Sequence, residues 1–349
     1  MAVTIKDVAK MANVAPSTVS RVIANNPRIS EKTKKRVREA MEELGYHPNF
    51  IARSLANQST QVIGLVMPAS ADKTFQNPFF PEVLRGISTA AHEKQYALHM
   101  STGVTGNEIL EGVMQMVQGR RVDGIILLYS AVEDKIIKYL QKECFPFVVI
   151  GKPFEQVEEI THVDNDNYRA AKEATQHLIG LGHERVAFVG GSIQLVVTID
   201  RLLGYEKAIR DAGIQYRDEY IIHEEFLKEG GQEAISELLS LEEPPTALVV
   251  SDDLMSLGIL NTLHDMGISV PDQMSIVSFN NVLLAEVARP PLTSVDINIF
   301  QLGFQAAKTL IQKVKDPSEP TKRIIIPHTM VKRHTCKEMT KQNGDGNID

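Results

Sequence analysis

The stretch of sequence that decides how this chain is organised runs from residue 4 to residue 22 and reads TIKDVAKMANVAPSTVSRV. Thr4 is a residue type that caps helices, and Asp7 stands three residues later, in the capping-box position. Four apolar residues at helical spacing follow the cap: Ile5, Val8, Ala9 and Ala12. Asn13 tolerates turn geometry. The sequence therefore predicts a short capped helix followed by a tight turn.

A second helix is expected to begin at Pro16, because proline is tolerated in the first turn of a helix. Its side chains divide into an inward set, Val19, Val22 and Ile23, and an outward set, Ser17, Thr18 and Arg21. Ser30 caps a third predicted helix, from Glu31 to Leu44, and Gly45 ends it. Two short helices joined by a turn and closed by a third predict a helix-turn-helix unit, whose second helix can enter the major groove of DNA.

Charge divides the chain into two unlike parts. The 349 residues carry a formal net charge of −7, which taken alone argues against a nucleic-acid partner. Residues 1–60, however, carry +5, and the rest of the chain carries −12. The ten basic residues of this head are Lys6, Lys10, Arg21, Arg28, Lys32, Lys34, Lys35, Arg36, Arg38 and Arg53. A basic head on an acidic body indicates an electrostatic partner for the head alone, although a merely solvated helix face has the same composition.

Several protein classes are excluded or disfavoured by the sequence. Two cysteines, Cys144 and Cys336, form no disulfide framework and no CxxC metal pair. No apolar run approaches the roughly 18 to 20 residues of a membrane helix, and the first residues lack the apolar core of a secretory signal. The motifs GxGxxG, GxxxxGK[ST], HExxH and GxSxG are absent. We therefore expect a cytoplasmic protein that is not an enzyme and has no membrane partner, cofactor or metal site.

From residue 61 onward, short apolar runs alternate with helical stretches. The predicted strands include 62–67, 124–128, 147–150, 186–189, 247–250 and 275–279, and the predicted helices include 81–94, 107–118, 167–181, 201–212, 231–241 and 254–266. Apolar strands separated by helices predict parallel sheets that are covered on both faces. A split near 161–164 predicts two α/β lobes, with a ligand cleft at the carboxyl ends of the strands.

Four blocks of the head closely resemble the DNA-binding domain of the LacI/GalR family of bacterial repressors. They occur in the family's order and at its distances: residues 4–9 (TIKDVA), 17–22 (STVSRV), 45–49 (GYHPN) and 52–55 (ARSL). The resemblance implies base contacts from Pro16, Ser17 and Arg21, and phosphate contacts from Thr18, Tyr46 and Asn49. An arginine fork such as that of Arg21 matches O6 and N7 of guanine.

Residues 49–57 resemble the family's hinge helix, which forms on DNA. The resemblance implies that Arg53 and Leu55 contact the minor groove, where an apolar wedge at Leu55 would kink the duplex. The alternative for Leu55 is a linker residue that packs on the body.

The body resembles the sugar-binding-protein fold of the same family as far as about residue 337. Family blocks stand at 163–165, 190–191, 200–205, 251–253 and 291–295, and shorter blocks at 76–81, 120–124, 150–152 and 164–167 resemble the family's maltose-operon repressors. The resemblance implies an effector site made by Phe79, Phe80, Lys152, Asp164, Arg201, Phe226, Asp252 and Asn280. Asn280 departs from the family, which often has Asp there, and this bears on which sugar binds.

The chemistry of these side chains suits a sugar. Arg201 offers a planar fork to hydroxyl or ring oxygens, while Asp252 and Asn280 can accept from vicinal hydroxyls. The phenylalanines could stack on the apolar face of a pyranose, or could be plain core residues. For Arg201 the alternative is a structural salt bridge.

The sequence thus predicts a homodimeric repressor that binds palindromic operator DNA and leaves it when maltose or a maltodextrin binds. Its predicted parts are a helix-turn-helix domain (1–46), a hinge (47–60), an effector-binding and dimerisation body (61–338) and a flexible tail (339–349) without the leucine heptads of tetramers. Lobe 1 is expected at about 61–161 plus 293–322, and lobe 2 at about 162–292 plus 323–338. Two alternatives are a periplasmic sugar-binding protein, which would need a secretory signal and no head, and a catabolite-control regulator of the same family that acts with a phosphoprotein.

Overall fold

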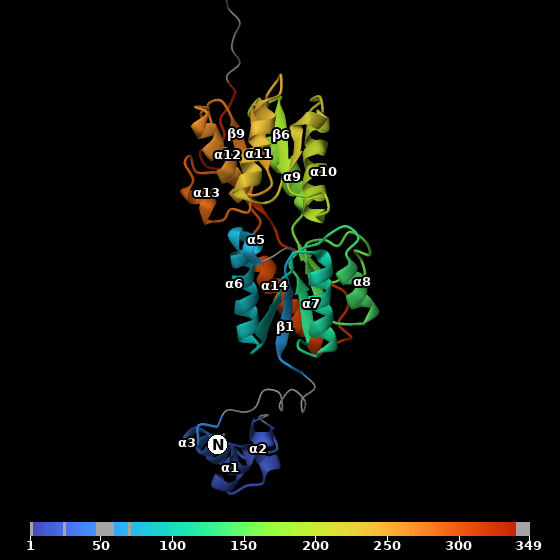
Figure 1. Ribbon diagram of the computed structural model, residues 1–349, viewed down its shortest axis with the longest axis vertical. Coiled ribbons are helices and arrows are strands. Elements are labelled where there is room, and N and C mark those ends of the chain that lie inside the picture. Colours follow the sequence, from blue (N-terminus) through green and yellow to red (C-terminus); the bar gives the residue numbers. More distant parts are fainter. Residues whose placement is uncertain (1–2, 24–25, 47–58, 69–70, 340–349) are drawn as a thin grey trace, which may run out of the picture. The chain divides into compact units, whose positions relative to one another are not determined.

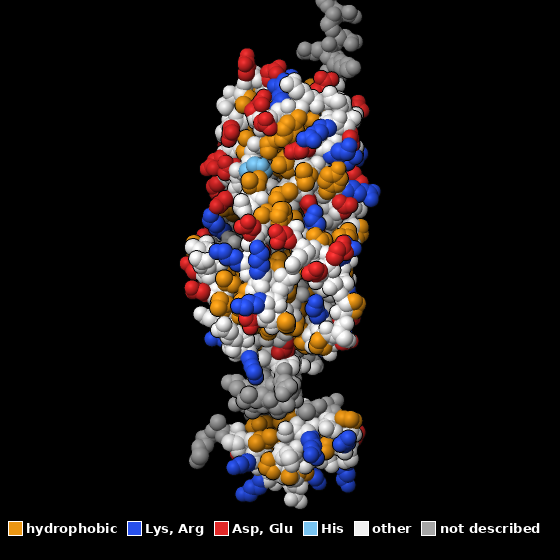
Figure 2. Space-filling model, turned by 90° about the vertical axis from the view of Figure 1, so that its right-hand side faces the viewer, with side chains coloured by type: hydrophobic (Ala, Val, Ile, Leu, Met, Phe, Trp, Pro, Cys, Tyr) orange, Lys and Arg blue, Asp and Glu red, His pale blue; other side chains and the backbone are white. Residues whose placement is uncertain are grey.

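The computed structural model describes residues 3–23, 26–46, 59–68 and 71–339. The chain divides into two compact units, a head (Met1–Gln61) and a body (Val62–Asp349) (Figure 1). Charged side chains on the visible face of the head are mostly Lys and Arg, whereas acidic and basic side chains are interspersed on the body (Figure 2). No helix among the described residues is both long and apolar enough to span a membrane.

The head is the predicted three-helix unit, with α1 at Ile5–Met11, α2 at Pro16–Ile23 and α3 at Glu31–Glu43. The carboxylate of Asp7 accepts the backbone N–H of Thr4 at 2.9 Å, which is half of the predicted capping box. The turn after α1 places Asn13 at a φ of +49°. The core of the head consists of Val8, Ala9, Ala12, Val19, Val22, Val37 and Ala40. The predicted helix-turn-helix fold is confirmed.

The first lobe of the body contains a six-stranded sheet in which every neighbouring pair is parallel. Its strands lie in the order β11 (Arg323–Ile325), β5 (His162–Asp164), β4 (Phe147–Ile150), β3 (Gly124–Leu127), β1 (Val62–Val66) and β2 (Ala97–Ser101). The helices of this lobe are α5 (Ala71–Gln76), α6 (Phe79–Glu93), α7 (Gly106–Gln118), α8 (Lys135–Lys142) and α14 (Ile299–Lys315). Side chains of α6 and α14 join the apolar core on one side of the sheet, and those of α7 and α8 join a separate core on the other.

The second lobe has the same architecture with one antiparallel edge strand. Its sheet has the order β12 (Thr329–Val331), β10 (Thr293–Asp296), β9 (Ser275–Phe279), β8 (Ala247–Val250), β6 (Val186–Gly190) and β7 (Ile221–His223), of which β12 alone is antiparallel to its neighbour. Its helices are α9 (Asn167–Gly180), α10 (Val196–Asp211), α11 (Lys228–Leu239), α12 (Asp253–Asp265) and α13 (Leu283–Val287), with a 3-10 turn, η1, at Asp218–Tyr220.

Glycine allows close packing of one helix pair in each lobe. A Cβ atom on Gly303 of α14 would lie 2.1 Å from the backbone oxygen of Val83 on α6. In the second lobe, a Cβ on Gly204 of α10 would lie 2.1 Å from the backbone oxygen of Tyr168 on α9. Neither gap leaves room for a side chain, so these two helix pairs depend on glycine.

The predicted lobe boundaries were wrong by one strand at each of three crossings. The chain leaves lobe 1 after β5 rather than before it, leaves lobe 2 after β10, and returns to lobe 2 between β11 and β12. Two of these strands have three residues and one has four, and their polar residues resemble a linker in sequence. Because the strands of a parallel sheet end at one edge, the chain can change lobes only after a strand has reached the cleft.

Candidate DNA interface and effector cleft

The polar face of α2 carries the residues predicted to contact DNA. Pro16, Ser17 and Arg21 are exposed, and Arg21 makes no side-chain hydrogen bond or ion pair with any described residue. Thr18 is half-buried on the same helix. Tyr46 is half-buried against the core of the head, with its backbone N–H bonded to the oxygen of Met41. The predictions for Asn49, Arg53 and Leu55 fall outside the described residues.

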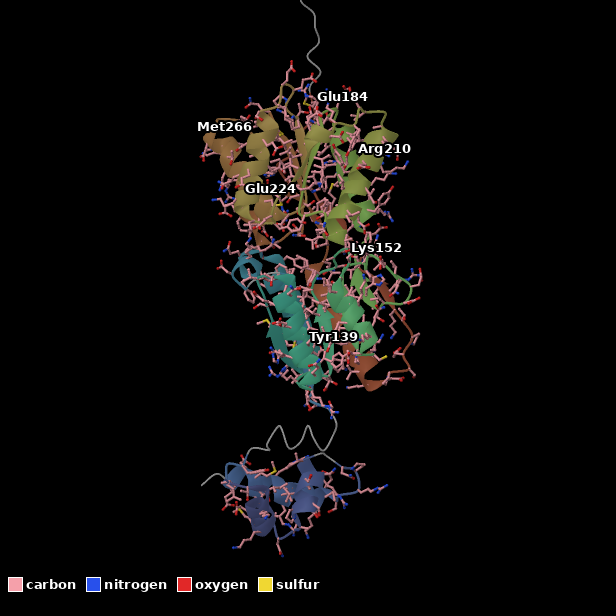
Figure 3. The ribbon with its side chains drawn as sticks, turned by 45° about the vertical axis from the view of Figure 1, so that its right-hand side comes forward. Tyr139, Lys152, Glu184, Arg210, Glu224 and Met266 are labelled. Carbon is pink, nitrogen blue, oxygen red and sulfur yellow. The ribbon has the colours of Figure 1, made fainter. Side chains whose placement is uncertain are left out.

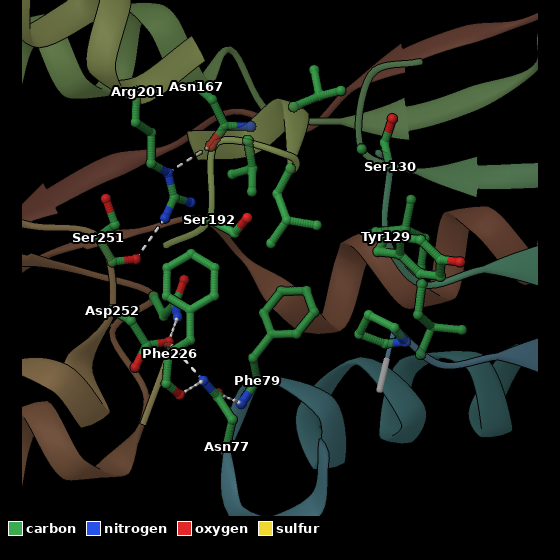
Figure 4. Close-up of a pocket in the computed structure, with 18 of the residues that line it drawn as sticks. Asn77, Phe79, Tyr129, Ser130, Asn167, Ser192, Arg201, Phe226, Ser251 and Asp252 are labelled. Atoms are coloured by element: carbon green, nitrogen blue, oxygen red, sulfur yellow. Dashed lines mark hydrogen bonds between the residues drawn. The ribbon is translucent and has the colours of Figure 1, made fainter. Parts of the chain in front are cut away.

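A cavity of about 750 Å³ separates the two lobes of the body. Its walls come from the carboxyl ends of strands in both sheets, where a ligand site is expected in folds of this kind. All eight residues predicted for the effector site line this one cavity: Phe79, Phe80, Lys152, Asp164, Arg201, Phe226, Asp252 and Asn280. Figure 4 shows these walls at close range, and Figure 3 shows Lys152 at the border between the lobes.

Arg201 lies on α10 and is only 4% exposed. Its Nε donates to Oδ1 of Asn167 at 3.0 Å, and its Nη1 donates to the backbone oxygen of Ser251 at 2.7 Å (Figure 4). Its guanidinium lies 4.2 Å from the ring centre of Phe279. Burial lowers the pKa of Arg201 to about 10, although nearby carboxylates oppose that shift. No described carboxylate lies within 4 Å of the guanidinium, so the salt-bridge alternative was wrong. The α10 helix begins at Val196, five residues before the predicted start.

Asp252 is buried at the N-terminus of α12. Its Oδ1 accepts the backbone N–H groups of Leu254 and Met255, at 2.7 and 3.4 Å, and so caps the helix. Its Oδ2 accepts the side-chain amides of Asn280 at 2.8 Å and of Asn77 at 2.9 Å. Burial raises the pKa of Asp252 to about 6, and these donors hold it below what burial alone would give.

Asp164 ends β5 on the floor of the cleft. Its Oδ1 accepts the amide of Asn167 at 3.0 Å, so the carboxylate and Arg201 are tied to the same asparagine. Burial raises the pKa of Asp164 to about 7, helped by the negative charge of Asp200. The carboxyl group therefore titrates near neutral pH.

The two lobes already touch across the cavity. Nζ of Lys152 lies 2.7 Å from Oδ1 of Asp200, and Nζ of Lys73 lies 2.5 Å from Oε1 of Glu225. Main-chain bonds also cross, from Val196 N–H to the oxygen of Ser130 at 3.0 Å and from Val132 N–H to the oxygen of Gln194 at 2.9 Å. These contacts form a closed arrangement of the lobes.

The three predicted aromatic residues serve both core and cavity. Phe79 and Phe80 meet edge to face at 5.2 Å and pack partly on the core of the body while lining the cavity. Phe226 lies against Gly191, where a Cβ atom would come within 2.3 Å of the ring. The phenylalanines are therefore core residues that also form part of the cavity wall, and their stacking on a pyranose stays a prediction.

Sequence reasoning missed several residues that line the cleft. Asn77, Tyr129, Ser130, Asn167 and Ser251 all do so. Asn77 precedes the two phenylalanines that were predicted, and Ser251 precedes Asp252. Their position at strand ends and helix starts was the available signal, but the bonds that give each of them a role depend on tertiary structure.

Two protein-family models match this chain. Residues 4–49 match the model described as bacterial regulatory proteins, lacI family, and residues 175–336 match the model described as periplasmic binding protein-like domain. With the relatives below, these matches show that the chain belongs to the LacI family of bacterial regulatory proteins. It is therefore a DNA-binding regulator of transcription with a two-lobed body.

Three individual proteins illustrate the similarity of this chain to members of the family. The chain is 43% identical to the HTH-type transcriptional regulator MalR of Streptococcus pneumoniae, over 95% of this chain and 100% of that protein. It is 33% identical to catabolite control protein A of Priestia megaterium, over 97% and 100% respectively. A solved complex of the transcriptional regulator CelR with cellobiose is 30% identical, with a TM-score of 0.76, and covers 95% of this chain and 99% of that one.

Proposed function

We propose that this chain is the repressor of a sugar-utilisation operon and that its effector is maltose or a maltodextrin. It would act as a homodimer on a palindromic operator, since a twofold protein matches a twofold site. The effector would bind between the lobes and release the protein from DNA. The similarity to MalR supports the maltose assignment over the catabolite-control alternative, because the catabolite control protein is the more distant relative.

The observation that carries this proposal is the interlobe cavity of about 750 Å³ with donors, acceptors and aromatic rings on its walls. A sugar presents hydroxyl groups at the edge of each ring and C–H groups on its faces. Arg201 and Asn280 supply polar groups, and Phe79 and Phe226 supply apolar surface. The related structure that holds cellobiose, a disaccharide, supports a ligand of this class.

The head supports the DNA half of the proposal. Ser17 and Arg21 are exposed on one face of α2, and the charge of residues 1–60 is +5. Arginine and a small hydroxyl can bond base edges, whereas Thr18 and Tyr46 would contact phosphates and set the register on DNA.

A thermal-shift screen of the full chain tests the effector. The panel contains glucose, maltose, maltotriose and cellobiose, each at concentrations up to several millimolar. A ligand at 100 times its Kd stabilises the protein that it binds by about 2.7 kcal/mol. We expect maltose or maltotriose to raise the melting temperature of the body and glucose to have little effect. If cellobiose alone raises it, the maltose assignment is wrong, and if none of the four does, the effector is not a sugar of this class.

A further inference from the structure

The carboxylate of Asp252 has no acceptor capacity left for a ligand. A carboxylate has about four lone-pair sites. Oδ1 receives two backbone N–H groups of α12, and Oδ2 receives the amides of Asn77 and Asn280. Asp252 is 4% exposed, so these bonds are shielded from water. In the closed arrangement a sugar hydroxyl could reach this carboxylate only by displacing one of its four donors.

Asn77 is the donor that comes from the opposite lobe. Its Oδ1 accepts the backbone N–H of Phe79 at 2.9 Å, which fixes the amide to the start of α6 in lobe 1. Its Nδ2 donates to Asp252 and to the backbone oxygen of Phe226 at 3.1 Å, both in lobe 2 (Figure 4). Asn77 is 5% exposed. The amide therefore joins the lobes by two bonds that can exist only when the cleft is closed.

One group beside Asp252 remains available to a ligand. The neighbouring Ser251 hydroxyl oxygen also has no hydrogen-bond partner in the described part of the chain, but it is buried away from the open space of the cavity. Asn280 lines the cavity and is held through its Nδ2 and its backbone N–H, while its Oδ1 receives no hydrogen bond from a described residue.

We propose that Asp252 is a positioning residue that clasps lobe 1 through Asn77, and that the Asn280 carbonyl, rather than the Asp252 carboxylate, accepts from the sugar. This inference rests on the proposed function and replaces the earlier expectation that Asp252 accepts sugar hydroxyls. It also explains why the residue at 280 is an amide. Aspartate there would place a second carboxylate against Asp252, whereas the amide donates to Asp252 and keeps an acceptor for the ligand.

The test is a set of protein–ligand double-mutant cycles measured by titration calorimetry on the full chain. The ligands are maltose and monodeoxy maltoses, each of which lacks one hydroxyl. The variants are Asn280→Ala, Asp252→Asn and Asn77→Ala. A side chain that contacts a given hydroxyl loses its effect when that hydroxyl is absent, while a residue that acts through lobe closure weakens all ligands by the same factor.

We expect Asn77→Ala and Asp252→Asn each to weaken every ligand by about tenfold, the loss of about one hydrogen bond to a charged group. Their effects should overlap, so the double variant should lose much less than a hundredfold. Asn280→Ala should lose its effect with one particular deoxy sugar. The inference is overturned if Asp252→Asn loses its effect with a single deoxy sugar, or if Asn77→Ala binds like the wild type.

Matched controls separate this result from general damage. Asp166 caps α9 as Asp252 caps α12 but does not line the cavity, so Asp166→Asn should bind maltose normally. Asn107→Ala is the same substitution as Asn77→Ala, made at an exposed site in lobe 1, and it should also leave maltose binding unchanged. If Asp252→Asn fails to fold, Asn77→Ala carries the same test. If wild-type protein binds no sugar of the panel, the proposed function fails, whereas binding without the predicted coupling pattern overturns this inference alone.

Discussion

The polar side chains of α2 in the head and those on the wall of the cleft in the body differ in exposure and in hydrogen bonding. Arg21 is exposed and makes no side-chain bond to a described residue, whereas Arg201 is 4% exposed and is bonded on two of its nitrogens. The head can therefore change its contact residues at little cost to its fold. The side chains that line the cleft are bonded to one another and to the backbone, so we expect substitutions there to change sugar binding and stability together.

The largest effect that this contrast predicts is for Arg201→Ala. The substitution removes both bonds of the guanidinium and leaves the buried carboxylates of Asp164, Asp252 and Asp253 without their nearby positive charge. A buried hydrogen bond to a charged group is worth about 1.5 to 3 kcal/mol, so loss of the two bonds costs about 3 to 6 kcal/mol. Urea unfolding of the body should show a loss of this size, and calorimetry should show no sugar binding.

Arg210→Ala is the matched control for that prediction. Arg210 is on the same helix, bonds Glu206 at 3.1 Å, and has a side chain 66% exposed on the outer side of the lobe (Figure 3). An exposed pair of this kind is worth about 0 to 1 kcal/mol. If the two arginine variants lose the same amount of unfolding free energy, the buried hydrogen bonds of Arg201 do not stabilise the body as described here.

A smaller effect is expected for Arg21→Ala in the head. Loss of a base contact should cost about 1 to 3 kcal/mol in operator binding and relax discrimination at one base pair. The melting temperature should not change, because Arg21 supports nothing in the head. Fluorescence anisotropy with operator and scrambled duplexes at fixed salt measures both quantities.

Arg36→Ala is the control for Arg21→Ala. It removes an exposed positive charge from α3 of the head and leaves α2 unchanged. It should weaken operator and scrambled DNA by a similar factor, since a charge near phosphates carries no sequence information. A loss of sequence preference from Arg36→Ala, and none from Arg21→Ala, would reverse the assignment of the reading face.

The smallest predicted effect concerns pH. The pKa of Asp164 is about 7 in the folded body, whereas its ordinary value is 3.8. Between pH 3.8 and pH 7 the folded body therefore holds a proton that the unfolded chain has released. The contribution of this group to stability is therefore greatest below pH 4 and is lost as the pH rises through 7. Asp164→Asn should lessen the fall in unfolding free energy between pH 6 and pH 8 by on the order of 1 kcal/mol.

Asp211→Asn is the reference for the pH series. Hydrogen bonds from Lys172 and Lys207 lower the pKa of Asp211, so its contribution is constant above pH 5. This variant should keep the wild-type slope between pH 6 and pH 8. A wild-type slope in Asp164→Asn as well would show that Asp164 is ionised throughout this range.

The same contrast explains how much could be predicted from the sequence. The three helices of the head are local, so caps, spacing and one turn residue placed α1, α2 and α3 within a residue of their observed ends. The cleft residues are distributed between residues 68 and 302 and meet only because two sheets end at one gap. A resemblance to a family could name eight of them, but it could not show their hydrogen bonds.

The errors have a common physical cause. The three strands at the lobe crossings are short and partly polar, and their pairing is set by distant strands, so local pattern assigned them to the wrong lobe. The role of Asp252 as a sugar acceptor stays a prediction, because its chemistry permits that role. The bonds that Asn77 and Asn280 make to its Oδ2 could not be predicted from the sequence.

The central claim is that a sugar in the cleft and an operator on the head act on one equilibrium. Such coupling is reciprocal, so each ligand must change the affinity of the other by the same factor. The direct measurement is the Kd of maltose with and without saturating operator, beside the Kd of operator with and without saturating maltose, in one buffer. We predict that both ratios are greater than one and equal within error. A maltose Kd that is the same with and without operator would contradict the account.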